Sequence, residues 1–254
     1  MDMLKNKLKY GKFIADSFYL EKHAKKVIVF CQGIPGISSY EEMAREYVKE
    51  GFIFIHPKYI GSWESFGEFH IKNCRDSIID FVNALFDKKV KTIFGQQFDL
   101  NFDKAFILGH SFGGSVALCA GADLNVDGII AISPVINYRK HAKESFKEED
   151  LSGLFDLMKA GFSNVYRNFK REEWEEFCKS GFDLNAIDYI EKLKNKKIFL
   201  IHGNKDKSVN YNKSRRFYFK LKTLGADISY LQTEDNHSNV KFNSISNIVL
   251  WMKQ

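Results

Sequence analysis

Five short apolar runs, separated by longer amphipathic stretches, constrain the fold of this chain more than any other feature. Nearly continuous apolar sequence is expected of a strand whose two faces are both covered by helices. A sixth run, at 227–231, alternates apolar and polar residues more strongly. The pattern predicts an α/β fold around a mostly parallel central sheet. The five runs are KVIVFC at 26–31, FIFIH at 52–56, AFILG at 105–109, GIIAIS at 128–133 and KIFLIH at 197–202.

The stretches between the runs have helical patterns. Residues 73–86 repeat apolar side chains at helical spacing. Two serines followed by two glutamates predict a capped helix at 38–50. Further helices are expected at 211–224 and 244–252. We therefore predict that helices cover both faces of the sheet.

One segment breaks the alternation of strands and helices. Residues 137–181 contain no strand-like run, only helix-like polar and aromatic sequence such as FSNVYRNFKREEWEEFCK. Because this segment lies between two predicted strands, we expect a helical cap inserted into a single domain that spans 1–254. The first 20 residues are expected to form a short strand or hairpin at the edge of the sheet.

Composition excludes several classes of protein. The net charge is +6, but basic residues are mixed with acidic ones and form no basic block with interleaved aromatic residues. No nucleic-acid surface is therefore predicted. Residues 105–122 carry no charge, but their glycines suit a strand, a tight turn and a helix better than a membrane span. The charged N-terminus and the four widely spaced cysteines favour a cytoplasmic protein with reduced thiols.

A serine motif follows the central apolar run. The segment Gly109-His110-Ser111-Phe112-Gly113 matches G-x-S-x-G and precedes SVALCA, a helix-like stretch of small residues. In a strand–turn–helix context, such a serine is exposed as a nucleophile above the sheet. The backbone N–H of Phe112, at the first turn of the helix, is expected to stabilise a developing oxyanion.

A serine nucleophile needs an imidazole base and a carboxylate that orients it. Asp206 follows the run at 197–202 through the turn HGNKDKSV. His237 lies in the loop between the last predicted strand and the last helix, from which it can reach Ser111. His202 ends a strand, which favours a structural role. Three other acids, none of which follows a strand in this way, remain alternatives to Asp206: Asp183, Asp188 and Asp235.

A second oxyanion donor is expected after the first apolar run. The segment Gln32-Gly33-Ile34-Pro35 supplies a tight turn at Gly33 and the N–H of Ile34, whereas Pro35 has no N–H to donate.

Together these residues resemble the α/β-hydrolase superfamily over nearly the whole chain. The likeness is strongest to single-domain relatives of the prolyl oligopeptidase catalytic domain and to cinnamoyl-esterase-like carboxylesterases. The segment PKYIGSWESFG at 57–67 is similar to the family loop D-x-x-G-x-G-x-S-x-G, and 201–209 is similar to H-G-x-x-D-x-x-V. The resemblance implies a triad of Ser111, Asp206 and His237, with Ile34 and Phe112 as oxyanion donors.

The chain departs from the family pattern at three positions. Gln32 replaces the histidine that usually opens the oxyanion loop, Pro57 replaces an acid, and Asn236 replaces the glycine common before the catalytic histidine. None of these changes removes a catalytic atom, but each weakens what the resemblance implies about substrate.

The expected activity is two-step acyl transfer without a metal or organic cofactor. A small carboxylic ester is the first substrate class, followed by a short peptide or aminoacyl amide, and then by thioester hydrolysis or acyl transfer. A non-catalytic binding protein of the same fold is the alternative from a different class. Aromatic residues of the 57–67 loop and of the cap are candidate pocket residues, although packing within the cap is the alternative for the last four: Tyr59, Trp63, Phe155, Phe162, Tyr166 and Trp174.

Overall fold

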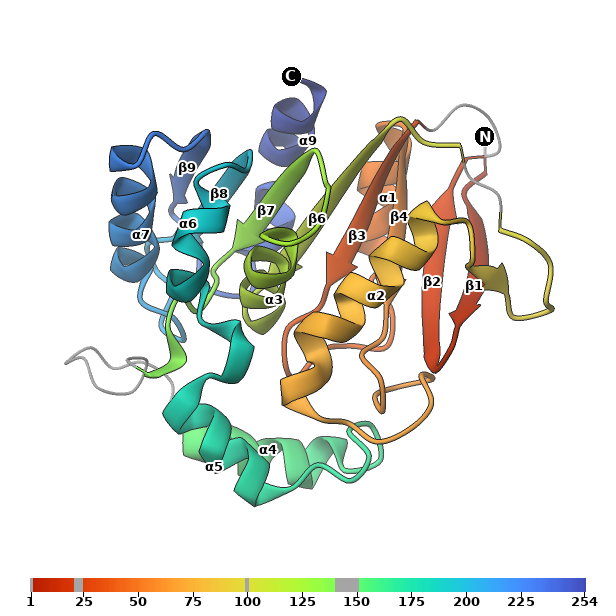
Figure 1. Ribbon diagram of the computed structural model, residues 1–254, viewed down its shortest axis with the longest axis horizontal. Helices are drawn as coiled ribbons and strands as arrows, with labels where there is room; N and C mark the ends of the chain where they lie inside the picture. The colour runs from red at the N-terminus through yellow and green to blue at the C-terminus, as the bar shows by residue number, and fades with distance from the viewer. Residues whose placement is uncertain (1, 21–24, 99–100, 140–150) are drawn as a thin grey trace.

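The computed structural model describes residues 2–20, 25–98, 101–139 and 151–254, and a nine-stranded sheet lies at the centre of this part of the chain (Figure 1). The strand order is β5-β1-β2-β4-β3-β6-β7-β8-β9. All pairs from β4 to β9 are parallel, whereas β1, β2 and β5 pair in antiparallel fashion. The strands are β1 Leu4–Tyr10, β2 Phe13–Tyr19, β3 Lys26–Cys31, β4 Phe52–Pro57, β5 Lys91–Thr92, β6 Lys104–His110, β7 Gly128–Ile132, β8 Ile198–Gly203 and β9 Ile228–Thr233.

Helices cover both faces of this sheet. In Figure 1, α2 and α3 lie in front of the strands, and α1 and α9 lie behind them. The bounds are α1 Glu41–Lys49, α2 Cys74–Phe86, α3 Phe112–Gly121, α4 Leu151–Phe162, α5 Arg171–Ser180, α6 Ile190–Leu193, α7 Tyr211–Thr223, α8 Val240–Asn243 and α9 Ile245–Lys253, with 3₁₀ turns η1 Ile71–Asn73, η3 Phe182–Leu184 and η4 Ala186–Tyr189. The predicted mostly parallel sheet with helices on both faces is thus confirmed.

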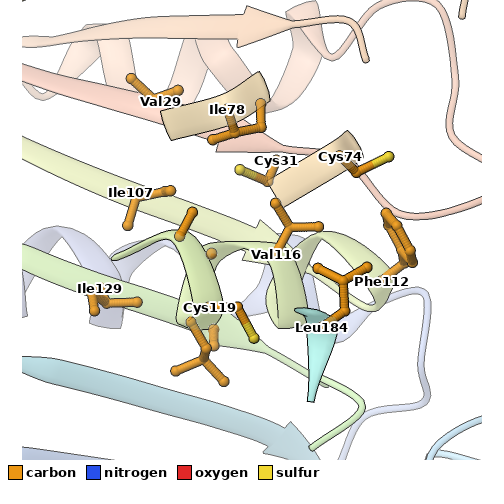
Figure 2. Close-up of a cluster of buried hydrophobic side chains, with 14 of the residues drawn as sticks. Val29, Cys31, Cys74, Ile78, Ile107, Phe112, Val116, Cys119, Ile129 and Leu184 are labelled. Atoms are coloured by element: carbon orange, nitrogen blue, oxygen red, sulfur yellow. The ribbon is translucent and has the colours of Figure 1, made fainter. Parts of the chain in front are cut away.

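The alternation of β3 side chains divides the core into two layers. Val27, Val29 and Cys31 pack in one cluster with α2 and α3, as Figure 2 shows for Val29, Cys31 and their neighbours. Ile28 and Phe30 pack in a second cluster with α1 and α9. Because successive strand residues point to opposite faces, a strand buried on both sides needs apolar residues throughout.

The uncharged run 105–122 is not one helix but β6, a turn at Ser111 and α3. Within the described residues, no helix combines the length and the apolar character needed to cross a bilayer.

The first two of the helices described between β7 and β8 belong to the predicted cap segment. They are α4 and α5, and they lie beyond the carboxyl ends of the parallel strands (Figure 1). Within the predicted cap segment, residues 140–150 lie outside the described residues. The side-chain N–H of Trp174 on α5 donates to the carbonyl of Leu151 on α4 at 2.7 Å, which ties the two helices together.

The structure corrects two local expectations in detail. The first helix starts at Glu41 rather than at residue 38, because Tyr40 is its N-cap and no serine side chain caps it. The β1–β2 hairpin forms near the edge as predicted, but β5 pairs outside β1 and takes the edge itself.

Candidate active site

Ser111 lies at the junction of β6 and α3 with a backbone conformation that is rare for a residue with a Cβ. Its φ is 58° and its ψ is −124°. The Ser111 N–H donates to the carbonyl of Ile132 on β7 at 2.9 Å, and its own carbonyl accepts from Gly114 at 2.9 Å. These bonds hold the turn in place, and Ser111 lines a surface cavity.

The two motif glycines permit this turn because backbone atoms approach them closely. A Cβ at Gly109 would overlap the carbonyl of Gly113, and a Cβ at Gly113 would overlap the carbonyl of Cys31. Helix α3 can therefore pack against β6 and β3 at backbone distance only if both positions lack a side chain.

Asp206 and His237 are joined by a short hydrogen bond. His237 Nδ1 lies 2.7 Å from Asp206 Oδ2. The other oxygen, Oδ1, accepts from the backbone N–H groups of Ser208 and Val209, each at 2.9 Å. Burial alone would raise the pKa of Asp206, but the hydrogen bonds from His202 and His237 hold it well below its usual range. An ionised carboxylate only accepts, so Nδ1 of His237 carries a proton and Nε2 is left to take up another.

Sequence reasoning assigned His202 a structural role and did not predict its contact with Asp206. This imidazole is fully buried, and its Nε2 lies 3.1 Å from both Asp206 Oδ2 and the carbonyl of Val209. Both partners are acceptors, so Nε2 carries the proton. The other ring nitrogen lies 2.8 Å from the hydroxyl of Ser214 on α7. One sequence signal could have predicted the contact: in HGNKD, a histidine at the end of a strand stands four residues before the acid.

His110 contacts the loop that carries His237. Its Nε2 lies 2.8 Å from the backbone carbonyl of His237, and the two rings are 4.8 Å apart. Since a carbonyl cannot donate, His110 Nε2 is protonated. Burial, and then the neighbouring His237 and Lys241, place the pKa of His110 well below its usual value, so this imidazole is held neutral.

Ile34 and Phe112 lie at the same cavity as Ser111. The loop that carries Ile34 is fixed from two sides. The Tyr59 hydroxyl donates to the carbonyl of Gln32 at 2.9 Å, and the N–H of Gly36 donates to the Tyr166 hydroxyl at 3.0 Å. One of these contacts comes from the β4 loop and the other from the cap segment.

A buried chain of polar side chains ends at the same loop. Lys58 Nζ lies 2.6 Å from Asp16 Oδ2 and 2.9 Å from His56 Nδ1. Because an ammonium only donates, His56 accepts at Nδ1 and its Nε2–H faces Gln32 Oε1 at 3.3 Å. Burial alone would raise the pKa of Asp16, but the ammonium groups of Lys58 and Lys7 lower it. The sequence did not predict this row of hydrogen-bonded side chains, because Asp16 and Lys58 lie 42 residues apart.

The cavity has a volume of about 320 Å³. Its apolar lining comes largely from α4 and α5, and its polar lining from the loops at the strand ends. In the described part of the chain the lining is Gly33, Ile34, Pro35, Tyr40, His110, Ser111, Phe112, Val135, Tyr138, Leu151, Leu154, Leu157, Trp174, Phe177, Ser208, Val209, His237, Ser238 and Lys241.

Of the six aromatic residues proposed for the pocket, Trp174 lies in this lining. Tyr59 and Tyr166 are directed instead at the backbone of the Ile34 loop, through the hydrogen bonds described above. Their hydroxyls fix the backbone of the loop that carries Ile34, and neither residue lies in the described cavity lining.

The remaining three aromatic residues also lie outside the described lining. The ring of Phe155 packs 5.2 Å from that of Phe169, and the ring of Phe162 lies 6.4 Å from that of Tyr166. Trp63 has a positive φ of 47° and its backbone N–H donates to Val165. Packing among aromatic residues of the cap, rather than cavity lining, accounts for the two phenylalanines.

Comparison with protein families identifies a family to which the chain is similar over most of its length. A model of the prolyl oligopeptidase family matches residues 43–252, which include Ser111, Asp206 and His237. No curated protein sequence matches the chain.

Several solved structures share the fold. An esterase from Pyrococcus furiosus superposes with a TM-score of 0.68 at 15% identity, over 99% of this chain and 90% of the esterase. Est1E from Butyrivibrio proteoclasticus, solved with ferulic acid, gives 0.67 at 15% identity over 95% of each chain. An acylaminoacyl peptidase from Pyrococcus horikoshii gives 0.67 at 14% identity, over 100% of this chain and 41% of the peptidase. At these identities the likeness establishes the fold alone, which is that of the α/β-hydrolases.

Proposed function

The chain belongs to the prolyl oligopeptidase family of serine hydrolases, and we propose that it cleaves a small carboxylic ester by a Ser-His-Asp acyl-enzyme mechanism. The proposed nucleophile is Ser111, the base is His237 and the orienting acid is Asp206. The observation that carries the proposal is the 2.7 Å bond between His237 Nδ1 and Asp206 Oδ2, beside a cavity that His237 and the strained Ser111 turn both line.

In the first step, Ser111 Oγ attacks the ester carbonyl carbon and its proton passes to His237 Nε2. The carbonyl oxygen becomes an oxyanion, which the N–H groups of Ile34 and Phe112 stabilise. The N-terminus of α3 adds a favourable field, because helix N-termini carry partial positive charge. When the tetrahedral species collapses, the alkoxide leaves with the proton from His237.

In the second step, water attacks the acyl-Ser111 carbonyl and gives a proton to His237. The second tetrahedral species releases the carboxylic acid, and Ser111 Oγ recovers the proton. Asp206 stays ionised throughout and stabilises the imidazolium form of His237. Four hydrogen bonds donated to the Asp206 carboxylate favour its ionised form.

An ester is placed before other acyl substrates because the cavity is small and largely apolar near α4 and α5. Two of the structural relatives are an esterase and a protein solved with ferulic acid. A short peptide or aminoacyl amide is the second candidate, favoured by the family match and by the likeness to an acylaminoacyl peptidase. A thioester is the third, since the curacin thioesterase domain also shares the fold.

The test is covalent labelling together with ester turnover. Wild type, Ser111→Ala and Ser246→Ala are incubated with a fluorophosphonate and assayed on p-nitrophenyl esters of increasing acyl length. Ser246 is an exposed serine of α9 and serves as the matched control. We expect labelling and turnover in wild type and Ser246→Ala, and neither in Ser111→Ala. Labelling without ester turnover would favour an amide substrate, and absence of both in wild type would favour a binding protein.

A further inference from the structure

Lys241 brings a cation to the active-site cavity. It lies four residues after His237, on α8, and lines the same cavity as Ser111. The side chain is half-buried, and its Nζ lies 6.0 Å from the ring centre of Tyr40 and 5.3 Å from that of Phe242. Aromatic faces attract an ammonium but do not neutralise it.

No carboxylate balances this cation within the described residues. The described cavity lining contains neither Asp nor Glu, and the described ion pairs do not include Lys241. Burial lowers the pKa of Lys241, in the absence of a nearby acid that would raise it. By contrast, Lys253 on α9 pairs with Glu50 at 2.7 Å.

The part of the cavity lining that comes from α4 and α5 is suited to an apolar chain. Leu151, Leu154 and Leu157 come from α4, and Trp174 and Phe177 from α5. An occupant that satisfies the whole lining therefore combines an apolar portion with an anionic group. A carboxylate is an anionic group that an ammonium binds through a charge-assisted hydrogen bond.

We propose that Lys241 is a specificity-determining residue that binds a carboxylate of the substrate, so that the preferred substrates are esters carrying a free carboxylate and an apolar spacer. The proposal rests on the esterase function proposed above and names its substrate class. It also disfavours substrates with a free amino terminus, because the described lining has no carboxylate to receive an ammonium.

The experiment compares two esters that differ only in charge. One is the mono-p-nitrophenyl ester of suberic acid, and the other is the same compound with its free carboxylate methylated. For each variant we measure the ratio of kcat/KM for the acid to kcat/KM for the methyl ester. Variants are Lys241→Met, Lys241→Gln and Lys241→Arg, with thermal melting to establish folding. Lys253→Met is the control, because it removes one positive charge from a residue outside the described cavity lining.

We expect wild type to favour the acid about tenfold, since a hydrogen bond to a charged group is worth about that factor. The ratio should fall about tenfold in Lys241→Met and in Lys241→Gln, mainly through KM, and persist in Lys241→Arg and Lys253→Met. Added salt should reduce the preference of wild type.

Equal ratios in wild type and in both neutral Lys241 variants would overturn the inference while leaving the esterase function intact. If wild type cleaves neither ester and is not labelled by a fluorophosphonate, the proposed function fails, and this inference fails with it.

Discussion

His202 donates its Nε2–H to the same Asp206 oxygen, Oδ2, that receives the Nδ1–H of His237. The two donor–acceptor distances are 3.1 and 2.7 Å. The carboxylate of Asp206 therefore accepts from two imidazoles and two backbone N–H groups, which fixes its position before any substrate arrives. His202 touches no reacting atom, so its expected contribution is to position Asp206.

Replacing His202 with leucine should weaken catalysis. The change removes one donor from a buried carboxylate, and the loss of such a bond costs about 1–3 kcal/mol. We expect kcat for a p-nitrophenyl ester to fall roughly tenfold or more while KM changes little. His202→Gln can restore a donor to Asp206 and should recover part of kcat.

Ser214→Ala separates packing from positioning in this experiment. It removes the partner of the other His202 nitrogen but leaves the Asp206 bond. A loss of kcat in Ser214→Ala as large as in His202→Leu would mean that general disruption of the core, and not the Asp206 bond, is responsible.

Replacing Lys58 with methionine should destabilise the fold. Lys58 is fully buried against Asp16, and its loss would leave that buried carboxylate with the half-exposed Lys7, at 3.1 Å, as its one cationic partner among the described residues. Breaking a buried ion pair from one side costs about 3–5 kcal/mol. Urea unfolding measures the change, and Lys58→Met combined with Asp16→Leu should recover much of it. An unchanged free energy of unfolding in the single variant would contradict this account.

The free energy of unfolding should decrease as the pH falls below about 6.5. Burial, followed by nearby positive groups, lowers the pKa values of His56 and His110 well below the 6.5 of a free imidazole. Below that pH the unfolded chain takes up protons that the folded chain does not, so stability is full above 6.5 and is lost on acidification. Each group contributes a slope of about 1.4 kcal/mol per pH unit until its folded pKa is reached. Urea titrations between about pH 8 and 5 measure this slope, and a flat profile would be inconsistent with neutral buried histidines.

Two glycine substitutions should act in opposite directions. Gly113→Ala places a methyl group against the Cys31 carbonyl, and overpacking of this kind costs about 1–3 kcal/mol. Gly161, near the end of α4, has open space where a Cβ would lie and no positive φ. Gly161→Ala should therefore stabilise the protein by up to about 1 kcal/mol. Urea unfolding measures the change in the free energy of unfolding for each variant. Changes of the same sign in both variants would refute this reasoning.

The strands were predictable because a strand that is buried on both faces consists of consecutive apolar residues. Residues 26–31 match β3 residue for residue, whereas β5 is only Lys-Thr and has no pattern to detect. The helix start at Glu41 was missed because Ser38 and Ser39 satisfy a capping pattern that the chain does not use.

The position of a candidate site residue was predictable where it follows a strand closely: Ser111 comes directly after β6, and Asp206 comes three residues after the end of β8. It was not predictable where function depends on which way a helix faces. On α4, Leu154 and Leu157 reach the cavity while Phe155 packs on Phe169, and residue type alone favoured the phenylalanine. Contacts such as Lys58 with Asp16 depend on the pairing of distant strands, which no local pattern records.

The cap segment and the β4 loop form one structural unit. The N–H of Trp63 donates to Val165, that of Phe69 to Arg167 and that of Arg167 to Gly61, so the two segments pair along their backbones. Tyr166, within this pairing, also accepts from Gly36 in the loop that carries Ile34. A chimaera that takes the cap from a relative must therefore take the relative's 58–69 loop as well. We expect a chimaera that exchanges only one of the two segments to lose these backbone hydrogen bonds.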